Sequence, residues 1–388
     1  MWTAAVSLLA LLAVAACSSL RVPNAGLRSQ GEWLTEGGST ARSNAVDAGL
    51  PLPLKEDWVY NAGGGFGPGS PLTTGAHVFV YTRNGEVHAV SLEEGKKKGA
   101  DSFGESINGT PAISGTTIII PSAWGTKHGV VAHNLMTGSH LWKYRCPPVD
   151  DGILLAGEHV IFSDAKSTVH AVDLKTGTAK WKHDLDPSSA ITTAPILAAH
   201  STVIVADDRG RVYALDRLTG QTQWTSDVPG PVYATPAAAD GRIIVGTTRG
   251  VVSAMDVSNG NTLWEFRVDS DLVKFASPAV SDGRIVIGSS DGRVRAISAD
   301  DGSLEWTWHG DGAVTAAPLI AGEQVYFGTM GRMVYALGAV DGTELWSSEV
   351  RGRVKSAPAL YDNAIFFQSE PRYLYRFTPE DESYVRSD

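Results

Sequence analysis

The side chains that could carry out catalysis or bind a metal are few and widely spaced. The 388 residues include ten histidines and two cysteines, Cys17 and Cys146. A zinc site needs three or four His, Cys or carboxylate ligands that the fold brings together, whereas histidines such as His170 occur singly in predicted strands. Acidic pairs such as Asp207 and Asp208 stand in predicted turns, where Asp is favoured because it bonds its own backbone. The sequence therefore predicts no catalytic site, no metal site and no cofactor.

Composition and charge indicate a single large folded domain with many strands. Hydrophobic residues make up 43% of the chain and charged residues only 19%, and there are 42 glycines. This balance suits many short strands joined by turns. The net charge of -10 argues against nucleic acid as a partner.

A sequence repeat with a period of 39 to 43 residues sets the expected fold. Each repeat has a turn glycine, and in six of the seven a tryptophan follows four residues later. The glycines are Gly95, Gly138, Gly177, Gly220, Gly260, Gly302 and Gly342, and the tryptophans are Trp142, Trp181, Trp224, Trp264, Trp306 and Trp346. A period near 40 with four short strands per repeat is typical of a β-propeller, in which each repeat forms one blade.

Counting the blades depends on the two ends of the repeat region. The last repeat has no tryptophan after its turn, and Trp58 stands alone before the first repeat. We therefore expect the strand around Trp58 to be the fourth strand of the last blade, so that eight four-stranded antiparallel blades close a ring over residues 54–388. Closing the ring removes free sheet edges. The turn after Gly95 lacks its tryptophan, and Phe103 is the expected substitute.

One motif within the repeat resembles a known family. Ala214, Asp216, Thr219, Gly220 and Trp224 stand at the offsets of the tryptophan-docking motif of quinoprotein-type (PQQ-like) propellers. The resemblance covers roughly residues 54–379 and implies an all-β, eight-bladed propeller. It also implies that the tryptophans are structural, docking between blades: Trp58, Trp142, Trp181, Trp224, Trp264, Trp306 and Trp346.

The N-terminus resembles a bacterial lipoprotein signal. Residues 2–16 are apolar and too short to span a bilayer, and small residues precede Cys17. The resemblance implies a signal peptide at 1–16, a lipid on Cys17, and a tether and entry segment over 17–53. Ser18 in place of Asp favours sorting to the outer membrane, facing the periplasm. No Lys or Arg precedes the apolar run, which departs from such signals and is consistent with a start further upstream. The alternative is a plain secretory signal with an incidental cysteine.

An oxidoreductase is the main enzymatic alternative. The dehydrogenases of the quinoprotein family hold pyrroloquinoline quinone between a tryptophan and a disulfide of two adjacent cysteines, and they coordinate calcium. Cys17 and Cys146 are far apart in the sequence, and the repeats carry no long insertion. The resemblance therefore does not extend to the quinone site, and a binding scaffold is favoured over an oxidoreductase.

The loops at one end of the ring predict an interaction surface. The tight turns between second and third strands carry one base per blade and share one end of the ring with the blade-to-blade loops, whereas the opposite end is acidic. Such an asymmetry could steer an anionic partner. The alternative is a set of ordinary solvated turn residues kept for solubility. The candidate partner-binding residues at the basic end are Phe66, Trp124, Arg209, Arg249, Lys274, Arg332 and Arg353, with Phe66 and Trp124 expected to be exposed anchors.

A lipid anchor combined with a bare eight-bladed ring is similar to the BamB family of lipoproteins. That resemblance implies a monomeric, non-enzymatic scaffold that binds protein partners of the outer-membrane barrel-assembly machinery and contacts the membrane through its lipid alone. The contact segment of enterobacterial members has no counterpart in the loop 184–190. A related propeller that binds another envelope ligand is the remaining alternative.

Overall fold

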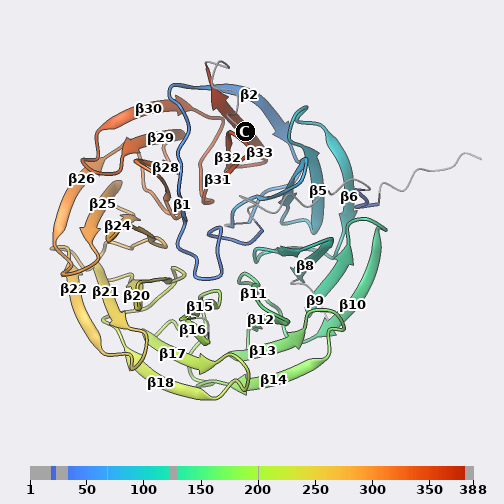
Figure 1. The fold of residues 1–388 in the computed structure, drawn as a ribbon, viewed down its shortest axis with the longest axis horizontal. Coiled ribbons are helices and arrows are strands. Elements are labelled where there is room, and N and C mark those ends of the chain that lie inside the picture. The colour runs from blue at the N-terminus through green and yellow to red at the C-terminus, as the bar shows by residue number, and fades with distance from the viewer. Residues whose placement is uncertain (1–18, 23–33, 68, 123–128, 200, 381–388) are drawn as a thin grey trace, which may run out of the picture.

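The computed structural model describes residues 19–22, 34–67, 69–122, 129–199 and 201–380. Within these ranges every regular element is a β-strand, and the strands form an eight-bladed propeller, which confirms the predicted fold (Figure 1). The predicted signal peptide, Cys17 and Trp124 lie outside the described residues. No helix in the described part of the chain has the length and hydrophobicity needed to cross a membrane.

The first four blades are antiparallel sheets built from consecutive strands, with the first strand of each nearest the centre. Their strands are β3 (Leu72–Thr74), β4 (His77–Tyr81), β5 (Glu86–Ser91) and β6 (Lys97–Ser102); β7 (Ala112–Ser114), β8 (Thr117–Ser122), β9 (Gly129–Asn134) and β10 (Ser139–Arg145); β11 (Leu154–Ala156), β12 (His159–Ser163), β13 (Thr168–Asp173) and β14 (Ala179–Asp184); and β15 (Ile196–Ala198), β16 (Thr202–Ala206), β17 (Arg211–Asp216) and β18 (Thr222–Asp227).

Blades 5 to 7 repeat this order, and blade 8 is completed from the N-terminal side. Their strands are β19 (Ala237–Ala239), β20 (Arg242–Gly246), β21 (Val251–Asp256) and β22 (Thr262–Arg267); β23 (Ala279–Ser281), β24 (Arg284–Gly288), β25 (Arg293–Ser298) and β26 (Leu304–His309); β27 (Leu319–Ala321), β28 (Gln324–Gly328), β29 (Met333–Gly338) and β30 (Glu344–Glu349); and β31 (Ala359–Tyr361), β32 (Ala364–Ser369), β33 (Tyr373–Pro379) and β2 (Leu54–Asn61).

The ring closes through the strand that carries Trp58. Strand β2 pairs antiparallel with β33, as the lone tryptophan before the first repeat predicted. The N-terminal side thus supplies the outermost strand of the last blade (Figure 1). Without β2, the outer edge of β33 would have no pairing strand, so this closure removes an open sheet edge where the two ends of the repeat region meet.

The burial pattern of the strands follows from their position in the blade. Second strands such as β16 are buried at every residue because a neighbouring blade covers each of their faces. Outermost strands such as β18 instead alternate between exposed and partly buried residues. Continuous β-branched runs and alternating runs in the sequence mark these two environments.

The seven tryptophans lie between neighbouring blades, each with its indole N–H donated to a backbone carbonyl 2.9–3.0 Å away. Trp142, for example, donates to the Leu174 carbonyl of the next blade. The turn glycine of that blade lies under the ring, and a Cβ on Gly177 would be 2.6 Å from the indole. Gly177 also has a positive φ of 68°, which favours glycine. The close approach of the indole and the backbone conformation therefore both require glycine at this position.

Residues 34–47, part of the predicted tether and entry segment, lie in the central channel (Figure 1). The middle N–H of the innermost strands of blades 2, 4, 5, 6 and 7 donates to carbonyls of this segment at 2.8–3.0 Å. Those carbonyls belong to Leu34, Thr40, Ala41, Ser43 and Asn44. Strand β1 (Ala45–Val46) then pairs in parallel with β27. The segment therefore satisfies backbone donors that would otherwise face the channel.

Truncation of one docked tryptophan tests how far the ring depends on these contacts. Trp306 is 8% exposed and donates to the Ala339 carbonyl at 3.0 Å. We expect Trp306→Ala to lower the free energy of unfolding by about 3–5 kcal/mol, because it removes a large buried side chain. The matched variant Trp306→Phe keeps an aromatic ring and loses the hydrogen bond, so it should cost about 1–2 kcal/mol. Urea unfolding of both variants measures the difference, and equal losses would contradict the packing explanation.

Candidate functional site

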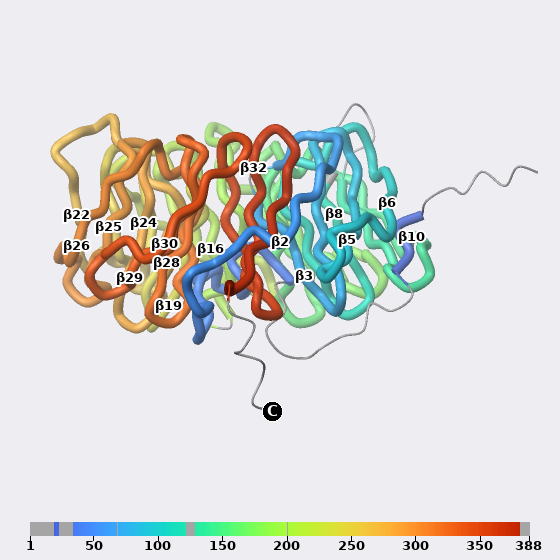
Figure 2. Tube along the Cα trace, turned by 90° about the horizontal axis from the view of Figure 1, so that it is seen from above, coloured from blue at the N-terminus to red at the C-terminus, as the bar shows by residue number. Residues whose placement is uncertain are grey.

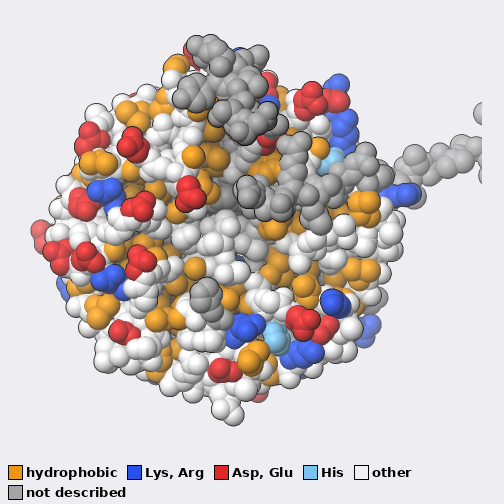
Figure 3. Space-filling view, viewed as in Figure 1, with side chains coloured by type: hydrophobic (Ala, Val, Ile, Leu, Met, Phe, Trp, Pro, Cys, Tyr) orange, Lys and Arg blue, Asp and Glu red, His pale blue; other side chains and the backbone are white. Residues whose placement is uncertain are grey.

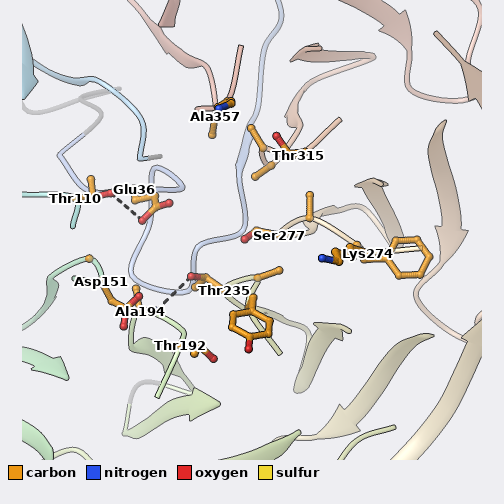
Figure 4. Close-up of a pocket in the computed structure, with 18 of the residues that line it drawn as sticks. Glu36, Thr110, Asp151, Thr192, Ala194, Thr235, Lys274, Ser277, Thr315 and Ala357 are labelled. Atoms are coloured by element: carbon orange, nitrogen blue, oxygen red, sulfur yellow. Dashed lines mark hydrogen bonds between the residues drawn. The ribbon is translucent and has the colours of Figure 1, made fainter. Parts of the chain in front are cut away.

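A cavity of about 730 Å³ lies at the centre of the ring, at the end that carries the blade-to-blade loops (Figure 4). Most of its wall consists of the small residues that precede the first strand of each blade, among them Thr192, Thr235, Ser277, Thr315 and Ala357. These positions face the axis because the chain turns inward there before it enters the innermost strand. The repeat thus gives the cavity a wall of methyl and hydroxyl groups.

One side of the cavity is acidic. Glu36 of the channel segment pairs with Arg42 and accepts a hydrogen bond from Thr110 Oγ1 at 3.0 Å. Asp150 accepts from the Asn108 amide at 3.0 Å. Burial, together with the nearby carboxylates of Asp150 and Glu36, raises the pKa of Asp151 to about 7. Asp151 therefore retains its proton to a higher pH than an ordinary Asp does.

The other side of the cavity carries two lysines. Lys274 is exposed at the mouth, and Lys355 pairs with Glu370 at 2.9 Å. Tyr233 also lies at the mouth and is 59% exposed. The cavity is therefore polarised across its width, with carboxylates against blades 2 and 3 and ammonium groups on blades 6 and 8.

The lining residues do not fit the quinone site of the quinoprotein dehydrogenases. Neither a tryptophan nor a cysteine lines the cavity among the described residues. Cys146 forms no disulfide with a described residue, and burial and the Asp164 carboxylate raise its pKa to about 12. No described group of three His, Cys, Asp or Glu side chains is placed to hold a metal ion.

Buried histidines and turn aspartates form hydrogen bonds that connect strands to turns. His170 is 2% exposed, with Nε2 2.8 Å from Asp164 Oδ2 and Nδ1 3.1 Å from the Tyr144 hydroxyl. In the next blade the equivalent Tyr213 hydroxyl donates to Asp207, whose other carboxylate oxygen accepts two backbone N–H groups of its own turn. The sequence-based interpretation of these residues as packing and turn residues is confirmed.

The predicted partner-binding residues are distributed around one end of the ring. At this end, turns between second and third strands form backbone hydrogen bonds with the blade-to-blade loops. For example, the Ser290 N–H donates to the Lys274 carbonyl at 2.9 Å. Five of the candidates are exposed at this end: Arg209, Arg249, Lys274, Arg332 and Arg353. Lys274 lines the cavity and the four arginines do not. The five residues belong to five different blades or their entry loops and do not form a compact cluster.

The expectation that Phe66 is an exposed anchor is wrong. Phe66 is 5% exposed and packs in a core cluster with Val78, Val80 and Phe366. Its backbone forms a bridge with Thr82, which turns the side chain toward blade 8. Glycines on both sides in the sequence suggested a loose loop, but a single aromatic residue in such a loop fills the space between two blades.

The end that was predicted to carry one base per blade also carries carboxylates beside its bases. Arg332 pairs with Glu349 at 3.3 Å, and Arg211 pairs with Asp186 at 3.2 Å. The opposite end, seen in Figure 3, has groups of Asp and Glu around its rim with Lys and Arg between them. Both ends of the ring are therefore of mixed charge. Attraction of an anionic partner would depend on individual bases that have no ion-pair partner, more than on the electrostatic field of a whole end.

The acidic wall of the cavity was not predicted from the sequence. A signal was present two residues before the Pro that opens the first strand: the other blades have Gly, Thr, Ala or Ser there, whereas blade 3, which has no such Pro, has Asp151. The contribution of Glu36 could not be seen in this way, since it depends on where the channel segment lies.

Comparison with known proteins assigns the family. A family model described as outer membrane protein assembly factor BamB matches residues 37–190, 100–231, 165–309 and 307–383, which together span nearly the whole propeller. The chain belongs to the BamB family. Among curated proteins no sequence matches this chain.

Solved structures share the fold at low sequence identity. BamB from Moraxella catarrhalis is 18% identical with a TM-score of 0.71, covering 84% of this chain and 100% of that one. The quinohemoprotein alcohol dehydrogenase from Comamonas testosteroni is 15% identical with a TM-score of 0.75, covering 95% of this chain and 85% of that one. At these identities the BamB-like and dehydrogenase structures establish the propeller fold and not a shared activity.

The raised pKa of Asp151 predicts a pH-dependent loss of stability. The folded chain holds the proton up to about pH 7, whereas the unfolded chain releases it near the usual Asp pKa of 3.8, so folding becomes less favourable as pH rises between these values. We expect Asp151→Asn to be stabilised relative to the unmodified chain by at least about 1 kcal/mol at pH 8, and much less at pH 4.

Thermal unfolding at both pH values measures the Asp151 effect. Asp240→Asn is the control for loss of one carboxylate, because Asp240 lies in an exposed turn with φ of 49° that Asn also tolerates. A stability difference for Asp151→Asn that is the same at pH 4 and pH 8 would contradict the assignment.

Proposed function

We propose that this protein is a non-enzymatic, periplasm-facing lipoprotein scaffold that binds protein partners during the assembly of outer-membrane β-barrel proteins. The observation that carries the proposal is the BamB family match over residues 37–383, which includes the channel segment as well as the blades. The eight-bladed ring supports it, because the described connections between its strands are short and carry no long insertion.

The composition of the central cavity supports binding over redox chemistry. A quinone cofactor would need a tryptophan to stack on and, in the dehydrogenases, a disulfide of adjacent cysteines on its other face. The described wall offers threonines, serines and alanines with Asp151 and Lys274 at opposite sides. The alternative is an oxidoreductase, because the Comamonas testosteroni enzyme shares the propeller fold.

The anchor in this proposal is a lipid on Cys17 after removal of residues 1–16. Small residues lead up to Cys17, and Ser18 follows it, which favours the outer membrane over the inner one. A lipid with more than one acyl chain can hold a folded domain at a membrane without a spanning helix.

The partner face in this proposal is the end around the cavity mouth. Arg209, Arg249, Lys274 and Arg353 are exposed there and make no ion pair with a described residue, in contrast to Arg332. Arg side chains are common in binding hot spots because they offer several donors and a flat apolar surface. These bases suit a partner segment that presents carboxylates. Trp124 is proposed as an aromatic contact at the same end.

Charge reversal on this face tests the proposed function. We expect Arg209→Glu combined with Arg249→Glu to reduce recovery of the barrel-assembly machinery in a pull-down from detergent-solubilised envelopes by roughly tenfold, because like charges oppose the contact. Lys175→Glu is the matched control, since Lys175 is exposed in a third-to-fourth-strand turn at the opposite end.

The same eluate distinguishes the enzymatic alternative. Mass spectrometry identifies the co-purified proteins, and an absorbance scan detects a bound quinone. Recovery of the machinery with the unmodified chain and its loss in the double variant would support the scaffold. A bound quinone without a protein partner would overturn it.

A further inference from the structure

The tryptophan-docking position between blades 1 and 2 contains no tryptophan. Gly99 of β6 pairs with Ala89, as Trp142 of β10 pairs with Ala132, so Gly99 stands where the indole would be attached. Phe103, the expected substitute, is 5% exposed and packs edge-on against His133, with ring centroids 5.1 Å apart. It therefore contributes to the core of this interface without covering Gly99.

Residues 19–22 occupy the position of the missing indole (Figure 2). The Val22 N–H donates at 2.6 Å to the carbonyl of Leu135, which corresponds to the Leu174 carbonyl that accepts from Trp142 in the next interface. A Cβ on Gly99 would be 3.1 Å from the Ser19 carbonyl oxygen. The chain thus supplies, from its own N-terminal segment, both the donor and the cover that tryptophan supplies elsewhere.

The segment is held by more than this one hydrogen bond. Leu20 and Val22 are 0% and 3% exposed and belong to the core cluster of blades 1 and 2. The Leu20 carbonyl lies 2.9 Å from His133 Nε2, and Arg21 Nε donates to the Met136 carbonyl at 3.2 Å. Four consecutive residues are therefore fixed on the outer rim of the ring, and Cys17 precedes them by two positions.

The outer rim of the ring is electrically asymmetric about this point. The outermost strands of blades 1, 2 and 3 carry net charges of +1, +2 and +1, whereas those of blades 4 to 8 carry -1, 0, -1, -2 and -1. Lys97 of β6 and Lys143 and Arg145 of β10 are exposed. In a chain of net charge -10, the positive part of the rim therefore coincides with the place where the N-terminal segment docks.

We propose that the rim of blades 1 to 3 is a membrane-facing surface that binds anionic lipid headgroups, and that docking of residues 19–22 holds the ring with this rim toward the bilayer. The orientation part rests on the lipid anchor at Cys17 in the proposed function. A lipid attached two residues before a fixed segment places the bilayer next to that segment, and lysines near an anionic surface add attraction. The cavity mouth then opens sideways along the membrane.

The docking step is tested by amide hydrogen exchange on the mature full-length chain. We expect the Val22 amide to be protected, and Leu20→Asp to remove the protection because it places a charge at a fully buried position. Ser19→Asp is the matched control, because it adds the same charge at a neighbouring residue that is exposed. An unprotected Val22 amide in the unmodified chain, or equal exchange in both variants, would overturn the docking.

The lipid-binding surface is tested by co-sedimentation with vesicles of phosphatidylethanolamine and phosphatidylglycerol. The full mature chain carries Cys17→Ser in every sample, so that any binding comes from the rim and not from an acyl chain. We expect Lys97→Glu with Lys143→Glu to weaken binding at least about tenfold, and Arg267→Glu on the outermost strand of blade 5 to leave it unchanged. We also expect binding to fall in 0.5 M salt.

The outcomes separate this inference from the proposed function. Equal binding by the rim variants, or binding that persists on vesicles of phosphatidylcholine alone, would overturn the lipid-headgroup surface. The barrel-assembly pull-down uses other residues and would still stand. Loss of the pull-down with retained vesicle binding would overturn the scaffold and leave the lipid-binding rim supported.

Discussion

The contact between one blade's indole and the next blade's turn is the interaction on which the ring depends. Each blade is a small sheet with two apolar faces and cannot bury them alone. The tryptophan covers the turn glycine of its neighbour and donates to a carbonyl there, so apolar burial and a directed hydrogen bond act at the same place. Six of the eight interfaces contain both parts of this contact, and at a seventh Trp346 donates to the Leu54 carbonyl without a turn glycine beneath it. The interface between blades 1 and 2 uses the backbone of residues 19–22 instead.

A ring of eight blades leaves a channel that must be filled or solvated, and here the chain fills part of it with its own N-terminal segment. The carbonyls of residues 34–44 satisfy the inward N–H groups of five innermost strands. Because the segment carries Glu36 and Arg42, it also brings charge to the axis. The cavity above it is therefore shaped by two parts of the sequence, the repeat and the segment that precedes it.

The N-terminal region thus has two structural tasks in addition to any anchoring. Residues 19–22 complete an interface on the outer rim, and residues 34–47 complete the centre (Figure 2). A membrane anchor attached ahead of the first would be coupled to the body of the ring by buried side chains and hydrogen bonds, and not by a free linker. The proposed partner face and the proposed membrane-facing rim would then be separate surfaces of the same ring.

The sequence by itself determined the fold and the ring closure, because the repeat of glycine and tryptophan is a local pattern whose packing partners recur at a fixed spacing. Trp58 indicated the closing strand for the same reason. The sequence did not determine the burial of Phe66, the carboxylates beside the bases, or the acidic wall of Glu36 and Asp151. Each of these depends on residues far apart in the chain meeting in space. Only the tertiary structure decided that residues 19–22 replace a tryptophan, since a backbone N–H and a buried Leu20 leave no motif in the sequence; their role follows from the shape of an interface that lacks one indole.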